Sequence, residues 1–120
     1  MIDDLVLSLS ERLVEWRRDF HKYAEPAWQE VRTAAVIADT LKRLGYTVLC
    51  GREVVSEKHR MGLPSAEVLH EAAERALKQG ADPLWVERLG QGFTGVVGEW
   101  DTGRAGPVVA LRFDIDANDL

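Results

Sequence analysis

The sequence predicts an α/β fold, on the evidence of two helical apolar stripes near its start and two strand-like runs near its end. Over the first 44 residues, apolar side chains recur every three or four positions, which is the spacing of one helix face. From Phe93 onward the pattern changes to short β-rich runs separated by a glycine-rich turn at 101–106. This order predicts two helices and then mixed β-strands, with helices inserted between.

The first helix is expected over residues 3–22. Its apolar stripe consists of Leu5, Leu9, Leu13, Trp16 and Phe20. Ser8 and Glu11 stand at the spacing of a capping box, which leaves open a regular start at Ser8. Pro26 interrupts the pattern, because proline disfavours helix at the residue before it. The pattern therefore predicts one long helix with one apolar face.

A second helix is expected over about 28–44, where Gly45 ends it as a C′ residue. Its apolar stripe consists of Val31, Ala34, Ala35, Ala38, Leu41 and Leu44. Because alanine side chains are small, this helix is expected to pack closely on whatever lies beneath it. Residues 46–50 follow as a predicted short strand, so the first unit is helix, helix, strand.

Residues 51–92 are interpreted as a helical insertion, and packing into the main core is the alternative that the sequence leaves open. Ser65 is the predicted N-cap of a helix over about 66–79. Asp82 followed by Pro83 predicts the start of a second, short helix, because proline is favoured at the first helical position.

The final strands are expected at 93–100 and 107–113, paired as a hairpin. The apolar run at 108–111 indicates a central strand that is buried on both faces. Three glycines spaced by three residues occur in this region: Gly92, Gly95 and Gly98. Because no helix follows them, they indicate close backbone packing rather than a dinucleotide site.

Composition excludes several classes of protein. Hydrophobic residues make up 46% and charged residues 29%, as in soluble globular domains. Fifteen Lys and Arg against twenty Asp and Glu leave a charge of −5, so no nucleic-acid partner is expected. No apolar run approaches the roughly 18 residues of a membrane span. The acidic start is unlike a secretory signal, and the single Cys50 fits a reducing compartment, so a cytoplasmic location is expected.

Asp114 and Asp116 are the candidate functional residues, because they follow the last predicted strand. A strand has a period of two, so both carboxylates are expected on one face, at the end where open sheets place ligands. About 6–7 Å apart, the two charges would repel by about 2–3 kcal/mol at an effective dielectric of about 20. A cation, a hydrogen-bond donor or a proton would relieve this repulsion, and a solvated strand end is the alternative interpretation.

The remaining chemistry-bearing residues are expected to be structural. The three histidines are His21, His59 and His70. None of them forms a pair at the spacing of a helical zinc site, so no metal site is expected from this chain alone. Cys50 is interpreted as a small hydrophobic residue of a strand. The four tryptophans are interpreted as packing anchors, with stacking on an aromatic substrate as the alternative.

Several motifs, in order, resemble the opening of the metal-dependent amidohydrolases related to aminoacylase and carboxypeptidase. They are Arg-Arg-Asp-Phe-His at 17–21, Glu-Pro at 25–26, Glu-Val-Arg-Thr-Ala at 30–34 and Leu-Gly-Tyr at 44–46. The sequences at 92–98 and 106–117 resemble the first sheet strands of that family. The sequences at 51–55 and 60–64 resemble the insertion of its aminobenzoyl-glutamate hydrolases.

The resemblance implies hydrolysis of the amide bond of p-aminobenzoyl-glutamate or another N-acyl amino acid. In the family, a manganese or zinc ion polarises the carbonyl and activates a water. Asp116 matches the acid that orients or bridges the metal ligands. Asp114 stands where many relatives have a ligating histidine, but it is not interpreted as a ligand here. Both aspartates are therefore predicted to act as orienting residues in catalysis.

The motifs that supply the metal ligands and the general base in this family do not occur within residues 1–120. The chain is therefore expected to be a single incomplete catalytic domain, the N-terminal portion of such an enzyme, inactive alone and without a tightly bound metal. The alternative is a non-catalytic α/β module that binds another protein chain as its partner or self-associates.

Overall fold

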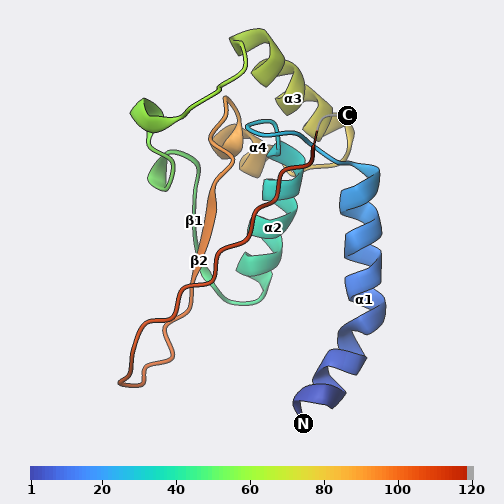
Figure 1. Cartoon of the computed structure of the whole chain (residues 1–120), viewed down its shortest axis with the longest axis vertical. Helices are drawn as coiled ribbons and strands as arrows, with labels where there is room; N and C mark the ends of the chain where they lie inside the picture. Colours follow the sequence, from blue (N-terminus) through green and yellow to red (C-terminus); the bar gives the residue numbers. More distant parts are fainter. Residues whose placement is uncertain (119–120) are drawn as a thin grey trace.

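Helices and a small antiparallel sheet make up the computed structural model, which describes residues 1–118 (Figure 1). The helices are α1 (Ile2–Lys22), α2 (Val31–Arg43), α3 (Ala66–Lys78) and α4 (Pro83–Leu89). The strands are β1 (Thr47–Cys50) and β2 (Val96–Glu99), and their register pairs Thr47 with Glu99 and Cys50 with Val96. This combination of helices and sheet confirms the predicted α/β class.

The hydrophobic core is centred on α2. Its buried members from α2 are Val31, Ala34, Ala35 and Ala38, and those from the rest of the described chain are Cys50, Ala72, Ala76, Ala81, Trp85, Val86 and Leu89. The small alanines allow α2 to contact α3 and α4 as well as both strands. Helices α3 and α4 of the stretch 51–92 thus share one hydrophobic cluster with α2.

The predicted caps of α3 and α4 are confirmed. The Ser65 hydroxyl accepts a hydrogen bond from the Val68 amide at 3.3 Å, and the Asp82 carboxylate accepts one from the Leu84 amide at 2.9 Å. Pro83 occupies the first turn of α4. These local signals placed both helix starts correctly because a cap depends only on residues within one turn of the helix.

Helix α1 projects from the body of the molecule, and none of its residues is buried (Figure 1). Along the predicted stripe, Leu5 is 64%, Leu9 45% and Leu13 48% exposed. Ser8 does not begin the helix, since its hydroxyl donates to the Leu5 carbonyl within α1 at 2.7 Å. The amphipathic pattern predicted the helix correctly, but only Trp16 and Phe20, near its C-terminal end, are half-buried, and the rest of the apolar stripe is exposed.

Arg32 ties the C-terminal end of α1 to the body. Its guanidinium donates two hydrogen bonds to the carboxylate of Asp19, at 2.8 and 2.9 Å. It also donates to the Gln79 carbonyl at 3.2 Å and lies 4.1 Å from the centre of the Tyr23 ring. Because two parallel hydrogen bonds fix a guanidinium in one orientation, this contact sets the direction in which α1 leaves the core.

The predicted hairpin of 93–100 with 107–113 is wrong. Strand β2 pairs with β1, and residues 107–113 form no strand in the described part of the chain. The chain turns after β2 and returns as an extended trace, with Val108 97% and Phe113 78% exposed (Figure 1). An apolar run becomes a buried strand only where other elements cover both of its faces, and residues 1–118 supply no such cover.

None of the described helices is both long and apolar enough to cross a membrane.

Candidate functional site

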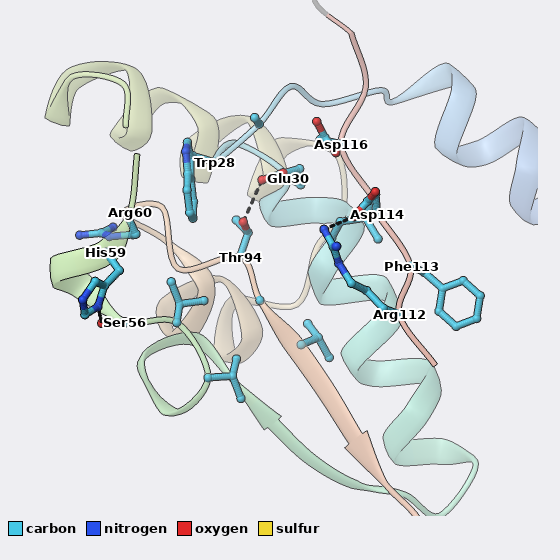
Figure 2. A pocket seen from close by; sticks show the side chains of 16 residues that line it. Trp28, Glu30, Ser56, His59, Arg60, Thr94, Arg112, Phe113, Asp114 and Asp116 are labelled. Atoms are coloured by element: carbon cyan, nitrogen blue, oxygen red, sulfur yellow. Dashed lines mark hydrogen bonds and ion pairs between the residues drawn. The ribbon is translucent and has the colours of Figure 1, made fainter. Parts of the chain in front are cut away.

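A cleft of about 620 Å³ lies between the start of β2 and the returning segment 112–116 (Figure 2). Residues 94–96 form one wall, and residues 112–116 form the other. Trp28 and Glu30, which precede α2, and the loop residues 54–56, 59 and 60 complete the lining. The cleft therefore joins segments from the beginning, middle and end of the chain.

Both predicted aspartates line this cleft. Ile115 packs against the hydrophobic core, while Asp114 and Asp116 on either side of it are exposed, so the expected alternation is present without a regular strand. The Asp114 carboxylate accepts a hydrogen bond from the Arg112 guanidinium at 2.9 Å. The structure thus brings the two residues to one cleft, and their part in catalysis stays a prediction.

Glu30 is the charged group that the sequence reasoning missed. It is only 7% exposed, and its carboxylate accepts a hydrogen bond from the Thr94 hydroxyl at 2.8 Å. Burial raises the pKa of Glu30 above its ordinary value, and the negative charges of Asp116 and Glu25 add to that rise. In the sequence, only the position of Glu30 immediately before the apolar stripe of α2 could have drawn attention to it. An acid at that position is also explained by the helix dipole, which favours a negative charge at the N-terminus.

The raised pKa of Glu30 makes the stability of the chain depend on pH. The folded chain holds the Glu30 proton more tightly than the unfolded chain, so this stabilising contribution is lost as pH rises from about 4.5 through the folded-state pKa. Glu30→Gln keeps an oxygen for Thr94 but cannot ionise. We expect the variant to gain stability relative to wild type as pH rises from about 4 to about 7, measured by urea unfolding. Parallel pH profiles for the two proteins would contradict this expectation.

Trp28 closes one end of the cleft. Its indole N–H donates to the Met61 carbonyl at 2.8 Å, which fixes the loop 51–64 beside the cleft. Trp28 has a φ of 67°, a left-handed backbone conformation that costs a bulky residue about 1–3 kcal/mol. The structure therefore shows Trp28 as an anchor between two segments, in line with the predicted packing role.

Glu25 holds the segment before α2 and the end of the described chain together. Its buried carboxylate accepts hydrogen bonds from the amides of Arg32 at 3.1 Å and Thr33 at 2.7 Å. It also accepts one from the Thr33 hydroxyl at 2.8 Å. The Glu25 backbone carbonyl accepts the amide of Ala117 at 2.8 Å, next to Asp116. Glu25 therefore caps α2 and, through its backbone, positions the aspartate segment.

The glycines near the cleft allow close packing, as predicted. A Cβ on Gly95 would lie 2.6 Å from a Val55 methyl group, and one on Gly92 would lie 2.6 Å from a Leu63 methyl group. Neither distance is compatible with an alanine unless the neighbour moves. These positions therefore serve the contact between β2 and the loop that lines the cleft.

The histidines and the cysteine do not converge on the cleft. His21 lies exposed on α1, His70 pairs with Glu74 on α3 at 3.6 Å, and only His59 reaches the cleft rim. Cys50 is a buried core residue, and burial raises the pKa of its thiol. Among residues 1–118, no three His, Cys, Asp or Glu side chains lie close enough to hold a metal ion. The described residues therefore do not fit a manganese or zinc ion by themselves.

Comparison with known proteins identifies relatives over the whole chain. No protein-family model matches the sequence. It is 51% identical over 119 residues to a subunit of the p-aminobenzoyl-glutamate hydrolase of Escherichia coli K12, covering 99% of this chain and 27% of that protein. It is 44% identical over 120 residues to the indole-3-acetyl-aspartic acid hydrolase of Enterobacter agglomerans, covering 28% of that protein.

A solved structure agrees with these sequences. The aminobenzoyl-glutamate utilization protein from Klebsiella pneumoniae matches 98% of this chain and 30% of its own, with a TM-score of 0.95 and 48% identity. The chain is thus similar in sequence to a class of bacterial hydrolases, and the solved structure of an aminobenzoyl-glutamate utilization protein has the same fold over this region.

More particularly, the chain is similar along its whole length to one subunit of p-aminobenzoyl-glutamate hydrolase, which confirms the resemblance predicted from the motifs. The chain spans about a quarter of the length of the curated relatives that it matches.

Proposed function

We propose that this chain supplies part of the catalytic unit of a metal-dependent amidohydrolase that acts on p-aminobenzoyl-glutamate or another N-acyl amino acid. The observation that carries the proposal is the 51% identity, over the whole chain, to a hydrolase of that compound. The position of Asp114 and Asp116 on the wall of a cleft supports it, because these residues match the orienting acids that the resemblance implies.

The names of the relatives support a substrate class. One is a hydrolase of p-aminobenzoyl-glutamate, and another is a hydrolase of indole-3-acetyl-aspartic acid. Each compound joins an aromatic acyl group to an acidic amino acid through one amide bond. We therefore propose an aromatic N-acyl derivative of glutamate or aspartate as the substrate. Because the Escherichia coli relative is named as one subunit of its hydrolase, we also propose a partner chain in the working enzyme.

A manganese or zinc ion is proposed as the cofactor of the assembled enzyme, where it would supply Lewis-acid chemistry at the amide carbonyl. Residues 1–118 do not form its site, so its ligands would come from polypeptide other than these residues. Asp116 is then a positioning residue, since a carboxylate beside a ligating side chain fixes the orientation of that ligand. A cytoplasmic location belongs to the same proposal and is supported by the reduced, buried Cys50.

A segment exchange tests the proposal. The region of the Escherichia coli hydrolase that this chain matches is replaced by this chain, and release of p-aminobenzoate is measured with manganese present. We expect the exchanged enzyme to be active, and Asp116→Asn in it to lower kcat/KM about 10- to 100-fold. Asp101→Asn, in the exposed turn after β2, is the matched control and is expected to leave kcat/KM unchanged.

Two results would count against the proposal. One is an exchanged enzyme that folds but releases no p-aminobenzoate. The other is an Asp116→Asn enzyme with the kcat/KM of the Asp101→Asn control. The isolated chain, with manganese and p-aminobenzoyl-glutamate, is expected to release no product, and turnover by the chain alone would contradict the proposed dependence on other polypeptide.

A further inference from the structure

We propose that Trp28 is a specificity-determining residue, and that its indole ring stacks on the aromatic acyl group of the substrate. This inference rests on the function proposed above and names the side chain that would select aromatic over aliphatic acyl groups. It concerns only the end of the cleft at which Trp28 and Glu30 lie near Asp116, and it does not involve the edge of β2 (Figure 2).

The backbone of Trp28 adopts a conformation that is unusual for a bulky residue. Trp28 is the third residue of a turn that the Gln29 amide closes by donating to the Pro26 carbonyl at 3.0 Å. Its φ of 67° is the value for which such turns favour glycine at that position. Strain of this kind persists where the direction of a side chain matters, which makes the contacts of the indole the feature to explain.

The indole is held by one edge and lines the cleft with the rest of its ring. Its N–H donates to the Met61 carbonyl at 2.8 Å, and the side chain as a whole is half-buried. Figure 2 shows the ring between the loop that carries Arg60 and the hydrogen-bonded pair of Glu30 and Thr94. A ring that is already fixed in orientation loses little conformational freedom when a ligand stacks on it.

The other three tryptophans already have stacking partners within the chain. These partners are Arg12 for Trp16, Lys42 and Arg88 for Trp85, and Tyr46 for Trp100, at 5.1 to 6.0 Å from the tryptophan ring centre. Among the described residues, neither a cation nor an aromatic ring stacks on Trp28. Trp28 is thus the tryptophan whose ring is left for a ligand, and it is the one that lines the cleft.

The negative charge near Trp28 favours the acyl half of the substrate there. The buried Glu30 and the exposed Asp116 both line this end of the cleft. The glutamate or aspartate half of a proposed substrate carries carboxylates, which these acids would repel. The proposed acyl groups are uncharged, and each has a ring-borne N–H: the amino group of p-aminobenzoyl or the indole N–H. Carboxylate oxygens accept hydrogen bonds from such donors.

The two arginines that line the cleft are already engaged. The Arg112 guanidinium donates to the Asp114 carboxylate at 2.9 Å. The Arg60 guanidinium donates to the carbonyls of Gln91 at 2.7 Å and Gly92 at 3.2 Å. A substrate carboxylate would have to compete with these contacts, whereas an aromatic ring on Trp28 would leave them in place.

The first test compares substitutions of Trp28 in the exchanged enzyme. Trp28→Leu and Trp28→Phe both remove the donor to Met61, but only the phenylalanine keeps an aromatic face. The readout is the ratio of kcat/KM for p-aminobenzoyl-glutamate to kcat/KM for N-hexanoyl-glutamate. We expect Trp28→Leu to lower this ratio about five- to tenfold, mainly through KM, and Trp28→Phe to lower it less than about threefold. Trp100→Leu, at an exposed tryptophan outside the cleft, is the matched control and is expected to keep the wild-type ratio.

The outcomes separate this inference from the proposed function. An exchanged enzyme that cleaves p-aminobenzoyl-glutamate with the same ratio in its wild-type and Trp28→Leu forms would overturn the role of Trp28 and leave the proposed function intact. Equal losses for Trp28→Leu and Trp28→Phe would also overturn it, because the hydrogen bond to Met61 would then account for the effect. Circular dichroism checks that each variant is folded.

The second test uses this chain itself and requires neither turnover nor a metal. Its four tryptophans give four indole N–H signals in heteronuclear NMR. Millimolar p-aminobenzoyl-glutamate is expected to shift the signal of Trp28 and not those of Trp16, Trp85 and Trp100, and glutamate alone is expected to shift none. If Trp28 does not shift, or if all four signals shift alike, the inference is wrong. A shift of Trp28 alone would support it even if the exchanged enzyme proved inactive.

Discussion

Gly51→Ala is expected to destabilise the chain by about 3 kcal/mol or more, which is enough to unfold much of a small domain. A Cβ at this position would lie 2.2 Å from the backbone carbonyl oxygen of Arg88, a distance that no side-chain rotation can relieve. Gly51 also has a φ of 64°, where an L-residue is strained. Its amide donates to the Gly95 carbonyl at 3.0 Å, so the backbone cannot move away without breaking the contact between β1 and the start of β2.

Gly62→Ala is the matched control for Gly51→Ala. Gly62 has nearly the same φ, 67°, but a Cβ there would meet no atom within 4 Å. We expect a loss of only about 1 kcal/mol, from backbone strain alone. Urea unfolding followed by circular dichroism measures both variants. If both variants lost the same free energy of unfolding, the positive φ, and not the contact with Arg88, would be the reason that position 51 does not tolerate alanine.

Glu25→Ala is expected to lower the free energy of unfolding by about 2–4 kcal/mol. The substitution leaves three donors without their acceptor: the amides of Arg32 and Thr33 and the Thr33 hydroxyl. A buried donor without a partner is destabilising, because the unfolded chain bonds it to water. The change also removes a negative charge from the N-terminus of α2, where the helix dipole favours one.

Two further variants make the Glu25 prediction specific. Glu25→Gln keeps one side-chain oxygen and is expected to lose about half as much as Glu25→Ala. Glu71→Ala, on the exposed face of α3, is expected to change stability by less than about 0.5 kcal/mol. Thermal and urea unfolding measure all three. A Glu25→Ala variant as stable as Glu71→Ala would mean that water replaces the carboxylate as acceptor without loss.

The elements that were predicted correctly are those specified by neighbouring residues. Ser65 and Asp82 cap their helices within one turn, and the alanine stripe of α2 follows from helical spacing. The predictions that failed needed partners distant in the sequence. Residues 107–113 have the composition of a central strand, and strand pairing depends on which other segment lies alongside.

The candidate site likewise combines residues whose placement follows from local sequence with residues whose role depends on distant partners. A period of two places Asp114 and Asp116 together on one side of Ile115, and this expectation needed no knowledge of the fold. The role of Glu30 could not be predicted, because its partner Thr94 lies 64 residues further along the chain. In the sequence, Glu25 is notable only as part of a motif. In the structure, its carboxylate accepts hydrogen bonds from the first turn of α2, although it lies five residues before Glu30, the N-cap residue of that helix.

The amino-acid sequence by itself determined the helices, their caps, the α/β class and the resemblance to amide-cleaving hydrolases, because these depend on local spacing and on motifs. Only the tertiary structure decided that β2 pairs with β1, that a cleft separates β2 from the returning segment, and that a buried Glu30 lies in that cleft beside Asp116. These features arise from contacts between residues far apart in the chain, whose free energy depends on the surfaces that the folded chain brings together.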